Sequence, residues 1–425
     1  MNQNNNVTLR KLTILFKYRI LNPLLNRLFF LYRPYIWWMS RRIRKKDKIK
    51  VLFILAELGS WKTERLYCKM KEHPRFEPIL GVTTSIEVPG SKAPLIEYLQ
   101  HKGYEFVDLD ESRNSIGEIS PDVKFYYKPY EESFPVQHRF LRHLKSLTCH
   151  IHYAFNQGSE KWAYNHLITK FCWFNFVENS SVVRTRSKIK GLYNGNVIAT
   201  GFPMQDDLNE EPDVYPDPWT KDDLHRKRII YAPHHSLPGT NKGGVQYSTF
   251  LDYGDFILEV AKKYKDKIQW AFKPHPTLYP KLLKIWGQQK TDDYYNAWKD
   301  ISFSQVELGE YKGLFKHSDA MIHDCSSFIV EYHYSHRPVL YLLRDEKHCD
   351  EQNEFGIAAF NAHYKACSKS DIEKFIEMVL AGEDSMQGTR DSFFNTYLIP
   401  PGNKSACDNI IDVLLGKDSF RTEGK

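Results

Sequence analysis

The fold class is decided by residues 319–342, DAMIHDCSSFIVEYHYSHRPVLYL. Its first residues are mostly apolar and lead into a polar Asp-Cys-Ser-Ser step, which predicts a buried strand that ends in a loop. SSFIVEYHYS (326–335) has the spacing of a helix, and RPVLYLL (337–343) predicts a second buried strand. A strand, a helix and a strand in this order predict a parallel βαβ unit.

The same alternation continues on both sides of this unit. It starts at KVLFIL (50–55), stops near residue 203 and restarts at RIIYAP (228–233). The intervening residues 203–227 contain four prolines and many acidic side chains without apolar periodicity, which predicts an interdomain linker. Two α/β series joined by one linker predict two doubly wound, Rossmann-like domains.

Length and composition agree with this division. The chain has 425 residues, a mass of 50.1 kDa and a mean hydropathy of −0.53, so it can form two cores and is too polar for a polytopic membrane protein. Its seven cysteines include no Cys-x-x-Cys pair and no zinc-finger spacing, which argues against a disulfide scaffold and a structural zinc site. A reducing compartment is therefore predicted.

Positive charge is concentrated at the amino terminus. Residues 1–50 contain thirteen Lys or Arg and one acid, a net charge of +12, whereas the whole chain carries +7. Leu, Phe and Trp are interleaved with these cations, without an apolar run long enough for a spanning helix or a signal peptide. We predict one or two amphipathic helices, broken at Pro23 and Pro34, on an anionic membrane surface. The alternatives are a solvated arm, a helix packed on the protein and, less favoured, a nucleic-acid-binding arm.

Polar side chains follow three predicted strands of the second series at their carboxyl ends, where open parallel sheets bind ligands. The two serines among them also begin a predicted helix, whose free N–H groups favour an anion. Histidine and lysine beside these N–H groups predict a phosphate or diphosphate ligand. In the order of the three strand ends, the residues are His234 and His235, Lys273 and His275, and Asp324, Ser326 and Ser327.

Each feature also has a purely structural explanation. Ser326 with Asp324 can simply cap a helix, and His275 between two prolines can be a turn residue. Their coincidence at three strand ends favours a binding site. The glycine-rich loop 239–244 lacks the spacing of a phosphate-binding loop, and no histidine–carboxylate cluster has metal spacing, so we predict no metal.

KPHP around His275, residues 318–342, TGFPMQD (200–206) and PGNKSACDNIIDVLL (401–415) carry a resemblance to a known family. Within residues 318–342 the pattern is SDxxIxDxSSxxxEY. These segments resemble the CDP-glycerol glycerophosphotransferase family, whose members prime and polymerise teichoic acids and related capsule polymers. The resemblance spans about residues 50–415.

The resemblance implies a GT-B fold, with a nucleotide donor on the carboxyl-terminal domain, an acceptor on the amino-terminal domain and a peripheral attachment to the bilayer. The family's WHGTPLK motif, which contains the expected base, has its counterpart in HIHYAF (150–155), so His152 is the predicted general base. The family's YAPTWR appears here as YAPHHS, which makes His234 or His235 the alternative base. The predicted donor site comprises His234, His235, Lys273, His275, Asp324, Ser326, Ser327 and Glu331.

These expectations combine into one hypothesis. The protein would transfer glycerol phosphate, or a related polyol phosphate, from a CDP-linked donor to a lipid-linked or polymeric glycan acceptor. It would act at the cytoplasmic face of the cell membrane, release CMP and need no cofactor or nucleic acid. A CMP- or CDP-sugar-dependent glycosyltransferase and a membrane-associated polyanion-binding scaffold are the alternatives. The predicted parts are a membrane segment (1–48), an acceptor domain (49–203), a linker (204–227), a donor domain (228–390) and a terminal helix with a tail (391–425).

Overall fold

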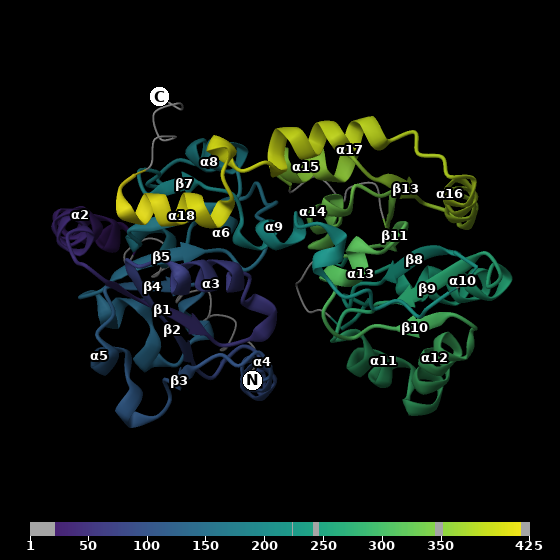
Figure 1. Cartoon of the computed structure of the whole chain (residues 1–425), viewed down its shortest axis with the longest axis horizontal. Helices are drawn as coiled ribbons and strands as arrows, with labels where there is room; N and C mark the ends of the chain where they lie inside the picture. Colours follow the sequence, from purple (N-terminus) through teal and green to yellow (C-terminus); the bar gives the residue numbers. More distant parts are fainter. Residues whose placement is uncertain (1–21, 223, 241–245, 345–351, 418–425) are drawn as a thin grey trace, which may run out of the picture. The chain divides into compact units, whose positions relative to one another are not determined.

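The computed structural model describes residues 22–222, 224–240, 246–344 and 352–417, and they form two compact α/β units (Figure 1). The first unit contains the described residues up to Ala154, Lys161–Pro203 and those from Lys404 onward. The second contains Phe155–Glu160 and Met204–Asn403.

The two units differ from the predicted division in one segment, and they take up two segments that the prediction left outside both domains. Phe155–Glu160, predicted to lie in the acceptor domain, belongs to the second unit. The terminal helix returns to the first unit, because its buried face packs there. The predicted linker belongs to the second unit, and its Trp219 is part of a hydrophobic core there.

The first unit contains a seven-stranded parallel sheet with the order β3-β2-β1-β4-β5-β6-β7. Six of the seven residues of β1 are buried, as expected for a parallel strand covered on both faces. The chain order reverses between β1 and β4, so the topological switch point lies there. The strands are β1 (Ile49–Leu55), β2 (Phe76–Val82), β3 (Phe106–Asp108), β4 (Val123–Tyr126), β5 (Leu147–Ile151), β6 (Phe174–Val177) and β7 (Val197–Ala199).

The helices of the first unit lie between these strands and at the two ends of the chain. They are α2 (Asn22–Arg44), α3 (Glu64–Glu72), α4 (Lys92–His101), α5 (Ile116–Ile119), α6 (Lys161–Tyr164), α7 (Leu167–Phe171), α8 (Ser180–Ser187) and α18 (Ala406–Leu415).

The second unit contains a six-stranded parallel sheet with the order β10-β9-β8-β11-β12-β13, in which the chain order reverses between β8 and β11. Its core contains stacked aromatic rings, such as Phe272 and Trp298 with centroids 5.1 Å apart. The strands are β8 (Lys227–Ala232), β9 (Ile268–Phe272), β10 (Ser304–Val306), β11 (Ala320–His323), β12 (Val339–Leu342) and β13 (Tyr364–Ala366). The helices are α9 (Pro203–Leu208), α10 (Phe250–Lys263), α11 (Leu278–Trp286), α12 (Gln288–Asp300), α13 (Lys312–Lys316), α14 (Phe328–Glu331), α15 (Glu354–Asn361), α16 (Lys369–Ala381) and α17 (Gln387–Phe393).

Helix α2 differs from the predicted break at Pro34, because the helix continues through that residue. Proline removes one backbone hydrogen bond, but burial of Phe29 and Ile43 holds the two halves against the first unit. Arg44 then donates from Nε and Nη2 to the carbonyls of Leu414 and Val413, at the end of α18. The part of the predicted amphipathic segment before residue 22 lies outside the described residues. No helix within the described ranges is both long and apolar enough to cross a membrane.

Candidate functional site

The carboxyl ends of β8, β9 and β11 meet at one edge of the second sheet (Figure 1). Strand β8 pairs with β9 on one side and with β11 on the other, so this edge contains the switch point. Parallel sheets bind their ligands at this position. The loops that follow bring together His234, His275 and Asp324, which the sequence places at these three strand ends.

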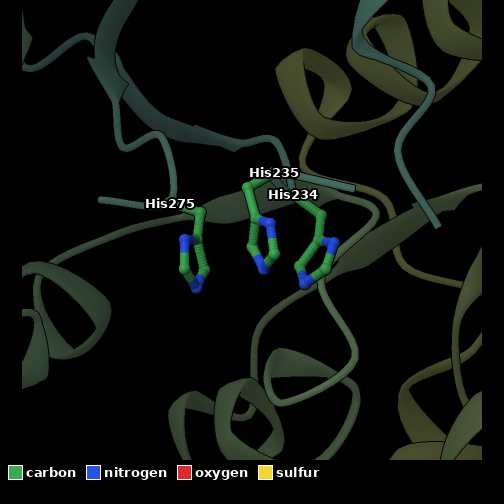
Figure 2. Close-up of side chains that lie close together, drawn as sticks. All are labelled: His234, His235 and His275. Carbon is green, nitrogen blue, oxygen red and sulfur yellow. The ribbon is translucent and has the colours of Figure 1, made fainter. Parts of the chain in front are cut away.

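Three imidazole rings, His234, His235 and His275, form what we call the histidine cluster. The ring centroid of His235 lies 4.3 Å from that of His234 and 4.1 Å from that of His275. The centroids of His234 and His275 are 5.4 Å apart. Figure 2 shows the rings side by side, each with one nitrogen at its free end, and these nitrogens point in a common direction. The cluster therefore presents three nitrogen atoms to one ligand.

The proton of His234 is placed by Ser236. Ser236 Oγ accepts the backbone N–H groups of Tyr247 and Ser248, at 2.8 and 3.2 Å, so its own proton is directed to Nδ1 of His234 at 2.8 Å. The Ser236 N–H donates to the same Nδ1 at 3.2 Å. Because Nδ1 accepts hydrogen bonds, the neutral ring carries its proton on Nε2.

The other two rings have the same tautomer. The Thr277 N–H donates to Nδ1 of His275 at 3.2 Å. The ammonium of Lys281 lies 2.8 Å from Nδ1 of His235, and an ammonium can only donate. The histidine cluster therefore presents three Nε2–H donors.

Burial keeps these rings uncharged near neutral pH. It is the largest cause that lowers the pKa of His234 to about 2, of His275 to about 3 and of His235 to about 4. The positive charge of Lys281 lowers all three pKa values further. A neutral N–H group donates to a ligand without the desolvation cost of a buried cation.

One nitrogen from each ring of the histidine cluster lies within 4.8 Å of the other two, which is close enough for one divalent metal ion. A metal ion binds an unprotonated imidazole nitrogen, whereas the contacts at Nδ1 place the proton of each ring on Nε2. Three convergent N–H donors suit an oxyanion instead. The arrangement therefore fits a phosphate group better than a metal ion.

Asp324 supports the histidine cluster from β11. Its Oδ1 accepts the backbone N–H of His234 at 2.5 Å, and its Oδ2 accepts the N–H and Oγ1–H of Thr249 at 2.6 and 2.9 Å. Burial raises the pKa of this carboxyl to about 6, although the hydrogen bonds act in the opposite direction. Asp324 is 0% exposed and both oxygens hold protein donors, so its geometry suits a positioning residue rather than the direct ligand that the sequence suggests.

Lys273 and Glu331 are both buried and meet around Tyr311. The Tyr311 hydroxyl donates to Glu331 Oε2 at 2.6 Å, and the Lys273 ammonium lies 5.5 Å from the centre of the Tyr311 ring. Lys273 Nζ also donates to the carbonyl of Gly309 at 3.0 Å. These contacts hold the loop before α13 against the strand ends, so direct donor binding by either residue stays a prediction.

Ser327 immediately precedes α14, as predicted, but the helix terminus differs from the predicted anion site. Helix α14 has four residues and is followed by a 3-10 turn, Tyr332–Ser335. Ser327 precedes the helix in a helical conformation, and its hydroxyl makes no capping hydrogen bond. The helix is too short for a substantial dipole, which removes the predicted reinforcement of an anion site there. The two half-buried serines remain beside Asp324 in the chain.

Gln157 is a residue of this site that the sequence did not reveal. Its side-chain Nε2 donates to the Ser326 backbone carbonyl at 2.9 Å. Its backbone carbonyl accepts the N–H of Asn353, at the start of α15. Gly356 leaves room for it, since a Cβ there would lie 3.0 Å from the Gln157 Cβ. Gln157 thereby links the loop after β11 to α15. No motif marks this role, because the partners are 169 or more positions away.

His152 lies in the first unit, directly after β5. Its Nδ1 lies 2.8 Å from the Ala154 carbonyl oxygen and 3.3 Å from the Ala154 backbone nitrogen. The shorter contact is with a group that can only accept, which favours a proton on Nδ1 and a lone pair on Nε2. Burial lowers the pKa of His152 and keeps the ring neutral. This tautomer is opposite to that of the histidine cluster and is the one that a general base requires.

Residues 121–396 match the family described as CDP-glycerol:poly(glycerophosphate) glycerophosphotransferase, and this range contains His152 and the histidine cluster. The chain belongs to this family. The predicted resemblance is thus confirmed. A relative in Bacillus subtilis (strain 168), the minor teichoic acid biosynthesis protein GgaB, is 29% identical over 165 residues. That match covers 37% of this chain and 17% of GgaB, so the matched segment spans only a small part of the length of this relative.

Solved structures confirm the fold class of this family member. A structure of the wall teichoic acid polymerase TagF with CDPG has a TM-score of 0.55 at 14% identity and covers 100% of both chains. A Staphylococcus aureus MnaA–UDP structure has a TM-score of 0.55 at 16% identity, covering 88% of this chain and 98% of MnaA. A putative UDP-N-acetylglucosamine 2-epimerase of Listeria monocytogenes has a TM-score of 0.56 at 14% identity, with 89% and 98% coverage. Two Rossmann-like units of GT-B type are therefore confirmed.

Proposed function

We propose that this protein transfers glycerol phosphate, or a related polyol phosphate, from a CDP-linked donor to a hydroxyl acceptor and releases CMP. The acceptor would be a lipid-linked or polymeric glycan of a teichoic-acid-like or capsular polymer. The observation that carries this proposal is the convergence of three Nε2–H donors at the switch point of the second sheet, within the segment that matches the family.

The donor side of the reaction uses the histidine cluster. Its three Nε2–H groups would donate to the phosphate oxygens of the diphosphate, and they would stabilise the charge that develops on the departing CMP. The donor already contains an activated phosphoanhydride bond, so the proposed reaction needs no cofactor.

The acceptor side uses His152. Its unprotonated Nε2 would take the proton of the acceptor hydroxyl while the hydroxyl oxygen attacks the β-phosphorus of the donor. A new oxygen–phosphorus bond forms, and the bond from the β-phosphorus to the bridging oxygen breaks. CMP leaves with that oxygen and its electron pair, and the product is a phosphodiester.

The experiment that tests this function is incubation with CDP-glycerol and a water-soluble glycerol phosphate oligomer. We expect CMP release and a new phosphodiester, detected by chromatography and ³¹P NMR. Formation of a glycosidic bond from a CMP- or CDP-sugar, with no product from CDP-glycerol, would favour a glycosyltransferase. Binding without turnover of any of these donors would favour a scaffold.

We further propose that α2 holds the protein on an anionic membrane surface at the cytoplasmic face. Phe30, Leu31, Trp37 and Trp38 are 63%, 76%, 57% and 50% exposed, although they are large and apolar. Arginine side chains lie over both Trp rings, at 4.0 and 5.6 Å. Exposed apolar side chains beside cations suit a helix in the headgroup plane.

Point variants test this attachment better than truncation, because removal of α2 would also remove Phe29 and Ile43 from the core. We expect a Trp37→Ser/Trp38→Ser variant to bind anionic vesicles several-fold more weakly than wild type. Trp162→Ser is the matched control, since Trp162 is 58% exposed elsewhere in the first unit. Salt at 1 M, where the Debye length is about 3 Å, should release only part of the wild-type protein. Equal binding of all three proteins would contradict the proposal.

A further inference from the structure

The carboxyl edge of the first sheet carries a second cluster of charged side chains. Glu57 follows β1, Lys128 follows β4 and Glu87 follows β2. Strands β1 and β4 are the pair between which the chain order reverses. Residues that follow these strands therefore lie at the position where such sheets bind ligands. We call these three residues the carboxylate cluster.

Lys128 connects the two carboxylates. Its Nζ donates to Glu57 Oε1 at 2.5 Å and to Glu87 Oε2 at 2.9 Å. Ser85 donates to the same oxygen of Glu57, and Ser133 donates to the same oxygen of Glu87. The second oxygens, Glu57 Oε2 and Glu87 Oε1, have no hydrogen-bond partner within the part of the chain that the structure describes.

Lys128 forms ion pairs with both glutamates. The Lys128 side chain is 7% exposed, and burial acts to lower its pKa, but hydrogen bonds to both glutamates outweigh burial and raise the pKa. Burial likewise acts to raise the pKa of Glu87, but its bonds to Lys128 and Ser133 lower it. One oxygen of each carboxylate is thus held by the protein, and the other is left as an acceptor.

Two tyrosines join this cluster to His152. The His152 ring stacks on Tyr153 with centroids 4.5 Å apart, and a side-chain hydrogen bond joins the hydroxyls of Tyr153 and Tyr130. Tyr130 follows β4, as Lys128 does, and its pKa is raised first by burial and then by the charge of Glu87. The proposed base and the carboxylate cluster therefore line one edge of the same sheet.

We propose that Glu57 and Glu87 bind the hydroxyl-bearing end of a polyol acceptor, each through its unoccupied carboxylate oxygen, and thereby present one hydroxyl to His152. The class of ligand follows from the chemistry, because ionised carboxylates accept hydrogen bonds from hydroxyl groups and repel phosphates. The assignment of this ligand as the acceptor rests on the proposed transferase function.

A neighbouring carboxylate on the same edge provides a matched control. Asp110 also pairs with a lysine, Lys92, at 2.7 Å. Both of its oxygens are occupied by Thr83, Thr84, Lys92 and His138. Asp110 has no oxygen left for a ligand, so Asp110→Asn tests the loss of a lysine–carboxylate pair without the loss of an acceptor site.

The test measures binding of a glycerol phosphate oligomer by NMR titration, with CDP affinity measured in parallel. Glu57→Gln and Glu87→Gln keep the size of each side chain but replace a carboxylate with an amide. We expect each variant to weaken oligomer binding at least 5-fold and to leave CDP affinity within 2-fold of wild type. Asp110→Asn should bind the oligomer as wild type does.

The outcomes separate this inference from the proposed function. Unchanged oligomer binding in both folded glutamate variants would overturn the carboxylate cluster as a polyol site, whatever the enzyme transfers. Equal weakening of oligomer binding by Asp110→Asn would also overturn it, because a general disturbance of the carboxyl edge of the first sheet would then explain the effect. If the oligomer binds as predicted but no CMP is released from CDP-glycerol, the polyol site stands and the transferase function fails.

Discussion

The carboxylate of Asp324 accepts the backbone N–H of His234 at 2.5 Å, which ties the end of β11 to the loop after β8. The same carboxylate holds Thr249 at the start of α10. A single buried side chain therefore sets the position of a histidine that follows a different strand. The position of His234 in the histidine cluster therefore depends on its backbone contact with Asp324.

Asp324→Asn should weaken both the fold and donor binding. The amide can accept through only one oxygen, so at least one buried N–H group would lose its partner, at a cost of about 1–3 kcal/mol. We expect the free energy of unfolding to fall by about 2 kcal/mol in urea titrations, with CDP affinity reduced several-fold. Thr249→Val removes only the hydroxyl bond and should have a smaller effect on both. CDP affinity equal to wild type in a folded Asp324→Asn variant would contradict the positioning role.

The histidine cluster should make the protein sensitive to acid. Burial lowers the pKa of His234 to about 2, whereas an unfolded histidine titrates near 6.5. The unfolded chain therefore binds more protons below pH 6.5, so the stability that the neutral ring contributes is present above 6.5 and is lost as the pH falls. His234→Gln should reduce the loss of unfolding free energy between pH 7 and 5, by up to about 1.4 kcal/mol per pH unit. Exposed His101→Gln is the control, and equal slopes in all three proteins would contradict the prediction.

Gln157 should affect the binding of the nucleotide donor, because it holds the backbone of Ser326. Gln157→Ala and Gln157→Glu both remove the N–H donor to the Ser326 carbonyl, a bond worth about 1 kcal/mol. We expect both variants to raise the KM for CDP-glycerol about 5-fold with little change in kcat. If only the alanine variant changes KM, packing of the side chain and not the hydrogen bond would be responsible.

Local patterns were sufficient to predict the two parallel sheets and the meeting of three strand ends. Buried parallel strands such as β1 and β11 are continuous apolar runs, and the carboxyl-edge rule selects the residues that follow them. The buried position of Asp324 was not predictable, because it depends on hydrogen bonds to residues 75 and 90 positions away. Glu57 and Lys128 were missed for the same reason, since they are 71 positions apart and match no motif.

Ring tautomers were also beyond sequence analysis. His152 and His275 both follow strands, so their sequence contexts are equivalent. Only the structure shows that the shortest contact of His152 Nδ1 is with a carbonyl, at 2.8 Å against 3.3 Å for an N–H group, whereas Nδ1 of His275 accepts from the N–H of Thr277. This difference supports the proposed roles of His152 as general base and of His275 as a hydrogen-bond donor to the nucleotide.

The central claim is that these two histidines act on different substrates, and parallel measurements of CDP affinity and CMP release from CDP-glycerol test it most directly. His275→Ala should weaken CDP binding at least 10-fold, about 1.4 kcal/mol. His152→Ala should bind CDP as wild type does but lose most of its turnover with a soluble acceptor, because only the base is absent. Wild-type turnover in His152→Ala, or wild-type CDP affinity and turnover in a folded His275→Ala variant, would contradict the assignment.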